Sequence, residues 1–169
     1  MIWGGISLAI LILIAGYLIY LKITPINARN KADVADVRFV LNWCELGDKR
    51  IERVVQSYTS ERTFTGDHLD AYAIKISNVT IEELTTKKEN GHGQWYRADS
   101  LPDILNKATE FISVWHDEIP WFPKEEAIRS KQFYVYPWKI NCNGITPSSV
   151  DLIFIKPNEK LVYFISLKV

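Results

Sequence analysis

The chain has 169 residues, of which 47% are hydrophobic and 12% aromatic, enough to form a packed core in one domain of ordinary size. Its 20 basic and 20 acidic residues are unevenly spread, because Lys22 and Arg29 are the only charged side chains in residues 1–30, which leaves 18 bases and 20 acids in residues 31–169. A mildly acidic domain without a basic stripe is unsuited to binding a phosphate backbone, so the expected partners include no nucleic acid.

An uncharged run of twenty residues, IWGGISLAILILIAGYLIYL, occupies positions 2–21. As a helix this run would be about 30 Å long, which matches the hydrocarbon core of a bilayer. Trp3 stands near one end, and Tyr17 and Tyr20 near the other, followed by Lys22, as is typical of membrane interfaces. A cleaved signal peptide would have a shorter apolar region behind a basic start. The sequence therefore predicts a single-pass anchor over residues 1–22 that contacts the lipid bilayer through residues 2–21.

The side of the membrane on which the domain lies is left open by the sequence. Basic residues gather just after the apolar run, which favours a cytoplasmic domain under the positive-inside rule; they are Lys22, Arg29, Lys31 and Arg38. Analogy of architecture with bacterial envelope proteins favours the outer side. We take an extracytoplasmic domain on a bacterial inner membrane as the expectation, against the charge count.

A tether and a helical region follow the anchor. Residues 23–30 contain Pro25 and polar side chains, which is typical of a linker, so the globular domain is expected at residues 31–169. Apolar residues at helical spacing predict two helices at the start of this domain, over residues 34–44 and 51–58.

The rest of the domain contains one clear helix and a series of strands. Apolar residues recur on one face of residues 101–119, before the PWFP sequence that stops a helix. Thr80 and Glu83 have the spacing of a capping box, which predicts a short helical turn. Strands are predicted at 69–76, 94–98, 131–142, 149–155 and 160–169. We expect an α+β fold in two layers, with an antiparallel sheet of about five strands and helices on one face.

The sequence GDHLD at residues 66–70 offers a possible site. Asp67, His68 and Asp70 are residue types that bind metals, and glycine permits a tight turn before them. A turn in which aspartate bonds backbone N–H groups explains the same residues without any chemistry. We favour the turn.

Two further histidines are candidates for a catalytic centre. His92 lies between glycines in a polar loop, and His116 lies near the end of the predicted helix. With Asp67 and His68 they could form the centre of a membrane-anchored hydrolase, but the chain has no HExxH, HxH or GxSxG motif. No metal or cofactor is predicted. Cys44 and Cys142 are expected either to form one disulfide or to be buried thiols.

Aromatic side chains near the PWFP sequence suggest a binding surface. In FYVYPW, strand alternation puts Tyr134 and Tyr136 on the face opposite Phe133, and a two-layer fold cannot bury both faces equally. Tyr and Trp dominate binding hot spots, so Trp121, Phe122, Tyr134 and Tyr136 are the predicted binding residues. The alternative is a second aromatic layer covered by the first helices.

Together these features favour a binding module held at a membrane by one helix. In architecture alone it is comparable to small anchored immunity or inhibitor proteins, which act by covering a protein partner. The two other hypotheses are the hydrolase described above and an accessory subunit of a membrane complex.

Overall fold

The computed structural model describes residues 32–86 and 93–169, all within the unit Ala32–Val169. The predicted anchor and tether lie outside the described residues. Within the described ranges no helix is both long enough and apolar enough to cross a membrane.

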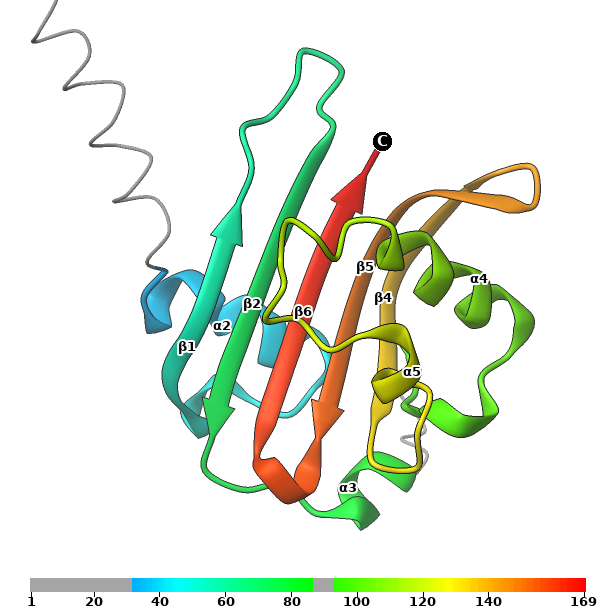
Figure 1. Ribbon diagram of the computed structural model, residues 1–169. Coiled ribbons are helices and arrows are strands. Elements are labelled where there is room, and N and C mark those ends of the chain that lie inside the picture. Colours follow the sequence, from blue (N-terminus) through cyan, green and yellow to red (C-terminus); the bar gives the residue numbers. More distant parts are fainter. Residues whose placement is uncertain (1–31, 87–92) are drawn as a thin grey trace, which may run out of the picture. The chain divides into compact units, whose positions relative to one another are not determined.

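A six-stranded antiparallel sheet forms the centre of this unit (Figure 1), in the order β1-β2-β6-β5-β4-β3. Its strands are β1 Ile51–Thr59, β2 His68–Ile76, β3 Tyr96–Arg97, β4 Tyr134–Asn143, β5 Thr146–Lys156 and β6 Leu161–Lys168. The α+β class and the antiparallel sheet are confirmed. The strand beyond the five predicted is β1, and the strand predicted at 94–98 is the two-residue β3 on the outer edge of β4.

Helices cover both faces of the sheet, so the expected two-layer arrangement with helices on one face is wrong. The helices are α2 Val34–Trp43, α3 Ile81–Thr85, α4 Asp103–Ser113 and α5 Glu125–Ile128, with 3₁₀ turns at Asp48–Arg50, Ala98–Ser100 and Pro157–Glu159. Figure 1 shows α4 and α5 in front of the sheet and α2 behind it. We call these two sides the α4 face and the α2 face.

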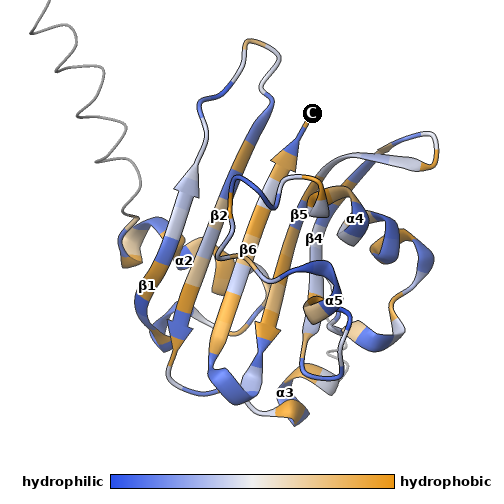
Figure 2. Cartoon of the chain, in the orientation of Figure 1, coloured by the Kyte–Doolittle hydropathy of each residue, from blue (hydrophilic) through white to orange (hydrophobic). Residues whose placement is uncertain are grey.

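Each face has its own core. On the α4 face, Phe154 packs with helix residues such as Leu105 and Ile112, and on the α2 face Phe164 packs with residues such as Leu41. Neighbouring positions in β5 point to opposite faces and are both buried, and Figure 2 shows hydrophobic residues running along β5 and β6. A nearly continuous apolar strand is what burial on both faces requires.

The second predicted helix, at residues 51–58, is strand β1. Its register against β2 shifts twice, between Ile51 and Arg53 and between Val54 and Gln56. Such irregularities change which side chains face the core, so the apolar residues recur at three- and four-residue intervals instead of two. The apolar residues of this edge strand are therefore spaced as they would be in a helix.

The predicted helix over residues 101–119 ends earlier than expected. Helix α4 stops at Ser113, and the next backbone bonds join residues three apart, from Trp115 N to Ile112 O and from Ile119 N to His116 O. These tighter turns carry the chain back across the α4 face towards α5.

Candidate functional site

The four predicted aromatic residues do not share an exposed surface. Tyr134 and Tyr136 are buried in the core of the α2 face, and Phe122 is buried on the α4 face, where its ring meets Phe154 edge to face. Trp121 is half-buried beside Phe122. Since helices cover both faces, Tyr134 and Phe133 can both be buried, which matches the alternative of a second aromatic layer.

Asp67 lies in the β1–β2 connection, where its side chain accepts from a threonine hydroxyl and not from the backbone N–H group that the turn interpretation of GDHLD expected. The Thr65 hydroxyl donates to Asp67 Oδ2 at 2.6 Å, and the Asp67 N–H donates to Thr63 Oγ1 at 2.9 Å. The hydrogen bond from Thr65 is the main reason that the pKa of Asp67 lies below its usual value. This aspartate stabilises the turn.

His68 and Asp70 belong to a row of polar side chains across the α2 face. Asp70, Ser166 and Asp151 are register neighbours on β2, β6 and β5. Ser166 donates to Asp151 Oδ1 at 2.5 Å, and His68 Nε2 lies 3.0 Å from Ser166 Oγ. Arg62 pairs with Asp70 Oδ2 at 2.8 Å. Burial is the main cause that raises the pKa of Asp70, while Arg62 opposes it.

The hydrogen bonds in this polar row leave one of its buried oxygens without a partner. His68 Nδ1 lies 2.9 Å from the Gly66 carbonyl oxygen, which can only accept, so Nδ1 is the donor there. The row forms a polar layer within the sheet, and Asp70 Oδ1 is its one buried oxygen without a hydrogen-bond partner in the described structure.

The residues proposed for a hydrolase do not converge. The side chain of His68 lies on the α2 face, whereas His116 lines a pocket on the α4 face, and Asp67 bonds to threonines of its own turn. His92 is outside the described residues. In the ranges that the structure describes, no three His, Cys, Asp or Glu side chains are placed to hold a metal ion.

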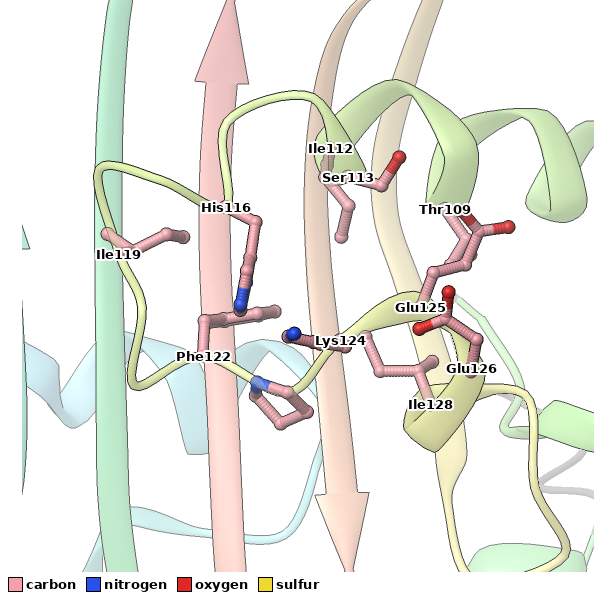
Figure 3. A pocket seen from close by; sticks show the side chains of 11 residues that line it. Thr109, Ile112, Ser113, His116, Ile119, Phe122, Lys124, Glu125, Glu126 and Ile128 are labelled. Atoms are coloured by element: carbon pink, nitrogen blue, oxygen red, sulfur yellow. The ribbon is translucent and has the colours of Figure 1, made fainter.

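The pocket beside His116 has a volume of about 290 Å³ and lies between α4, α5 and the segment that joins them (Figure 3). Its apolar wall is formed by buried side chains, namely Ile112, Ile119, Phe122 and Ile128. Charged side chains of Lys124, Glu125 and Glu126 complete it. Phe122 is therefore part of a pocket instead of an exposed surface.

Four exposed apolar residues lie towards one end of the sheet, although others, such as Val55 on β1 and Ile81 on α3, are exposed elsewhere. The β1–β2 and β4–β5 connections turn there, the last strand ends there, and Figure 2 shows hydrophobic residues at both hairpin tips. Phe64 is fully exposed in the first connection and Ile145 is 77% exposed in the second. Val114, just after α4, and the terminal Val169 are also exposed. We call these four residues the tip surface.

Two hollows adjoin the tip surface. One, of about 370 Å³, is lined by Phe111, Ile145 and Pro147 among others. The other, of about 460 Å³, includes Trp115 and Val169 in its lining. Val114 lies in the chain between Phe111 and Trp115, so a single segment borders both hollows.

A hydrogen bond fixes that segment against the sheet. Tyr58 Oη on β1 donates to Glu118 Oε2 at 2.6 Å. This bond, ahead of partial burial, raises the pKa of Tyr58 to about 12, so the phenol keeps its proton at neutral pH. The segment that borders the hollows is therefore held in place on the β1 side.

The two cysteines differ in environment. Cys44 is buried on the α2 face, Cys142 is exposed near the end of β4, and no disulfide joins them.

No known protein family, no curated protein and no solved structure shows significant similarity to this chain.

Sequence reasoning missed the partners of His68 and the tip surface. Asp151 and Ser166 each interrupt an apolar strand with a polar residue, which is a visible signal, but their meeting depends on the strand register. Phe64 and Ile145 stand alone in polar turns, so no periodic pattern marks them.

Proposed function

We propose that this chain is a membrane-anchored binding module whose tip surface covers a protein partner. The observation that carries the proposal is the set of exposed apolar side chains at one end of the sheet. Exposed apolar side chains that line hollows, as Ile145 and Val169 do, are suited to contacts with another protein. The uncharged run at residues 2–21 supports attachment to a membrane.

The shape of this end favours a protein partner over a small molecule. The exposed side chains come from two hairpin connections, the segment after α4 and the C-terminus, and Ile145 lines one of the two hollows and Val169 the other. Hollows beside exposed apolar groups can receive anchoring side chains from a second protein. An inhibitor or immunity protein would use such a surface to cover an active site.

The structure is compatible with the accessory-subunit hypothesis but does not favour the hydrolase hypothesis. An accessory subunit of a membrane complex would use the same surface, and it would differ by remaining in a stoichiometric complex after purification. The hydrolase lacks the convergence of Asp67, His68 and His116 that general acid–base catalysis requires.

A charge placed on the tip surface is expected to abolish partner binding. The double variant F64D/I145D of the full chain should lose at least about tenfold in partner recovered from native membranes, because burying each new carboxylate is strongly unfavourable. The folded state should be unaffected, because both side chains are exposed. Quantitative mass spectrometry of the recovered complex measures the effect.

The matched control is I81D. Ile81 is 50% exposed at the start of α3, which Figure 1 shows at the opposite end of the sheet. This variant should recover the partner as the unmodified chain does. Equal recovery by F64D/I145D, I81D and the unmodified chain would overturn the proposal.

A further inference from the structure

Three contacts in series run through His68 and Ser166 in the polar row. His68 Nδ1 lies 2.9 Å from the Gly66 carbonyl oxygen, and His68 Nε2 lies 3.0 Å from Ser166 Oγ. Ser166 Oγ lies 2.5 Å from Asp151 Oδ1. The side chains of His68, Ser166 and Asp151 are all partly buried. Each contact has the length of a hydrogen bond, and each hydrogen bond needs a proton of its own.

A neutral histidine leaves this series one proton short. The Gly66 oxygen can only accept, so a neutral His68 ring places its single proton on Nδ1. The Ser166 hydroxyl has one proton, and an ionised Asp151 has none. The hydroxyl can therefore donate to Asp151 or to His68 Nε2 but not to both, and one of the three contacts lacks a proton.

A second proton on His68 completes the series. The ring then donates to Gly66 from Nδ1 and to Ser166 from Nε2, and Ser166 donates to Asp151. The alternative is a proton on the Asp151 carboxyl group, with the hydroxyl of Ser166 donating to the ring. Histidine ordinarily takes up a proton near neutral pH and aspartate only near roughly pH 4, so the ring is the favoured place.

The charged groups around the ring are mostly acidic. Those that act on it electrostatically, bond in its series or line a hollow with it are Asp67, Asp70, Asp151, Glu61 and Glu118, with Arg62 and Lys168 as the basic groups. Arg62 is paired with Asp70 at 2.8 Å. On α2, Asp36 acts on Tyr72, further along β2. A second proton on His68 is thus placed among carboxylates that attract it.

We propose that His68 is a pH-dependent contact that holds the β1–β2 connection to the sheet. With its second proton, the ring joins Gly66 of the connection to Ser166 and Asp151 on the central strands. Without that proton, one bond of the series is lost and the connection is held less firmly. Phe64 lies in this connection, so its restraint depends on pH whether or not the tip surface binds a protein.

Nuclear magnetic resonance of the ring nitrogens tests the proton count. The full chain in detergent micelles, with ¹⁵N-labelled histidine, would be titrated over roughly pH 5 to 8, where histidine changes charge. The single proton of neutral His68 should be on Nδ1, and the second should appear on Nε2 as pH falls. A neutral ring with its proton on Nε2 would overturn the proposal.

The variant D151N separates the series of hydrogen bonds from simple charge. Its amide can donate to Ser166, whose hydroxyl is then free to donate to a neutral His68 ring. The pH at which half of the rings carry the second proton should fall by at least about one unit. S166A removes the acceptor of Nε2 without changing any charge, and it should lower this pH as well. An unchanged value in both variants would overturn the proposal.

The matched control is D67N. It also removes a carboxylate that acts on His68, but one that bonds Thr65 and is outside the series. It should shift the half-protonation pH by less than about half of the shift in D151N, because only the long-range charge is lost. Equal shifts in D67N and D151N would overturn the proposal.

Amide hydrogen exchange measures how firmly the connection is held. The Gly66 N–H donates to the Thr63 carbonyl oxygen at 3.0 Å. Its protection, corrected for the intrinsic effect of pH, should fall about three- to tenfold as His68 loses its second proton, which corresponds to one hydrogen bond. In D151N the neutral ring keeps all three contacts, so the protection should stay constant. Protection that is constant in the unmodified chain, or that changes equally in both proteins, would overturn the proposal.

Discussion

Replacing Phe164 with alanine is expected to lower the free energy of unfolding by about 3–5 kcal/mol, the usual cost of emptying a large aromatic site in a core. Phe164 is 2% exposed, and its ring contacts Phe39, Trp43 and Tyr72 on the α2 face. These partners cannot fill the space that the ring leaves without moving the helix. Chemical denaturation of the full chain in detergent, followed by tryptophan fluorescence, measures the change.

The matched change on the other face is Phe154 to alanine. Phe154 is fully buried against Phe122 on the α4 face, so its loss should destabilise by a similar amount. Phe64 to alanine is the control, because the same atoms are removed from a fully exposed site and the expected change is below about 0.5 kcal/mol. A small effect at Phe164 with a large one at Phe154 would contradict a sheet that is packed on both faces.

Removing Arg62 is expected to destabilise the protein more at pH 7 than at pH 4. Asp70 is 8% exposed, whereas its partner Arg62 is more than half exposed. We therefore expect R62A to lower the free energy of unfolding by about 1–2 kcal/mol at pH 7, which is less than the cost of breaking a fully buried ion pair. The measurement is denaturation of the R62A variant across this pH range.

The direction of this pH dependence follows from the pKa of Asp70. Burial already raises this pKa above its unfolded value, and removing Arg62 raises it further, because Arg62 lowers it. A carboxyl whose pKa is raised on folding contributes stability that is present below its unfolded pKa and lost as pH rises through the folded pKa. The penalty of R62A therefore grows as Asp70 ionises.

The amide variant D70N isolates this charge. In the D70N variant, adding R62A should change the free energy of unfolding little. The change should not depend on pH between 4 and 7, because the carboxylate that Arg62 paired with is absent. If R62A has the same cost in both backgrounds at pH 7, the pair with Asp70 is not the reason for the effect.

Local signals predicted much of the fold. Thr80 and Glu83 form the expected capping box, in which Thr80 N donates to Glu83 Oε2 at 2.9 Å and Glu83 N donates to Thr80 Oγ1 at 3.3 Å. The strands predicted at 131–142, 149–155 and 160–169 correspond to β4, β5 and β6. These features depend on spacing along the chain, which a sequence displays directly.

Features that depend on packing between distant segments were harder to predict. Bulges in β1 produced helical spacing in a strand, and the assumption of one covered face made Tyr134 and Tyr136 look exposed. The apolar run LIFI at residues 152–155 was a signal for burial on both faces. The candidate sites were the least predictable part, because Ser166 meets His68 only through the register of β2 and β6.

The most direct test of the binding proposal is photo-crosslinking from the tip surface in intact cells. A benzophenone amino acid would replace Phe64 or Ile145 in the full chain, and Ile81 would be the control position. The account predicts one protein adduct of the same identity at positions 64 and 145, and none at 81. No protein adduct at 64 and 145, or adducts to lipid alone, would contradict a tip surface that binds a protein.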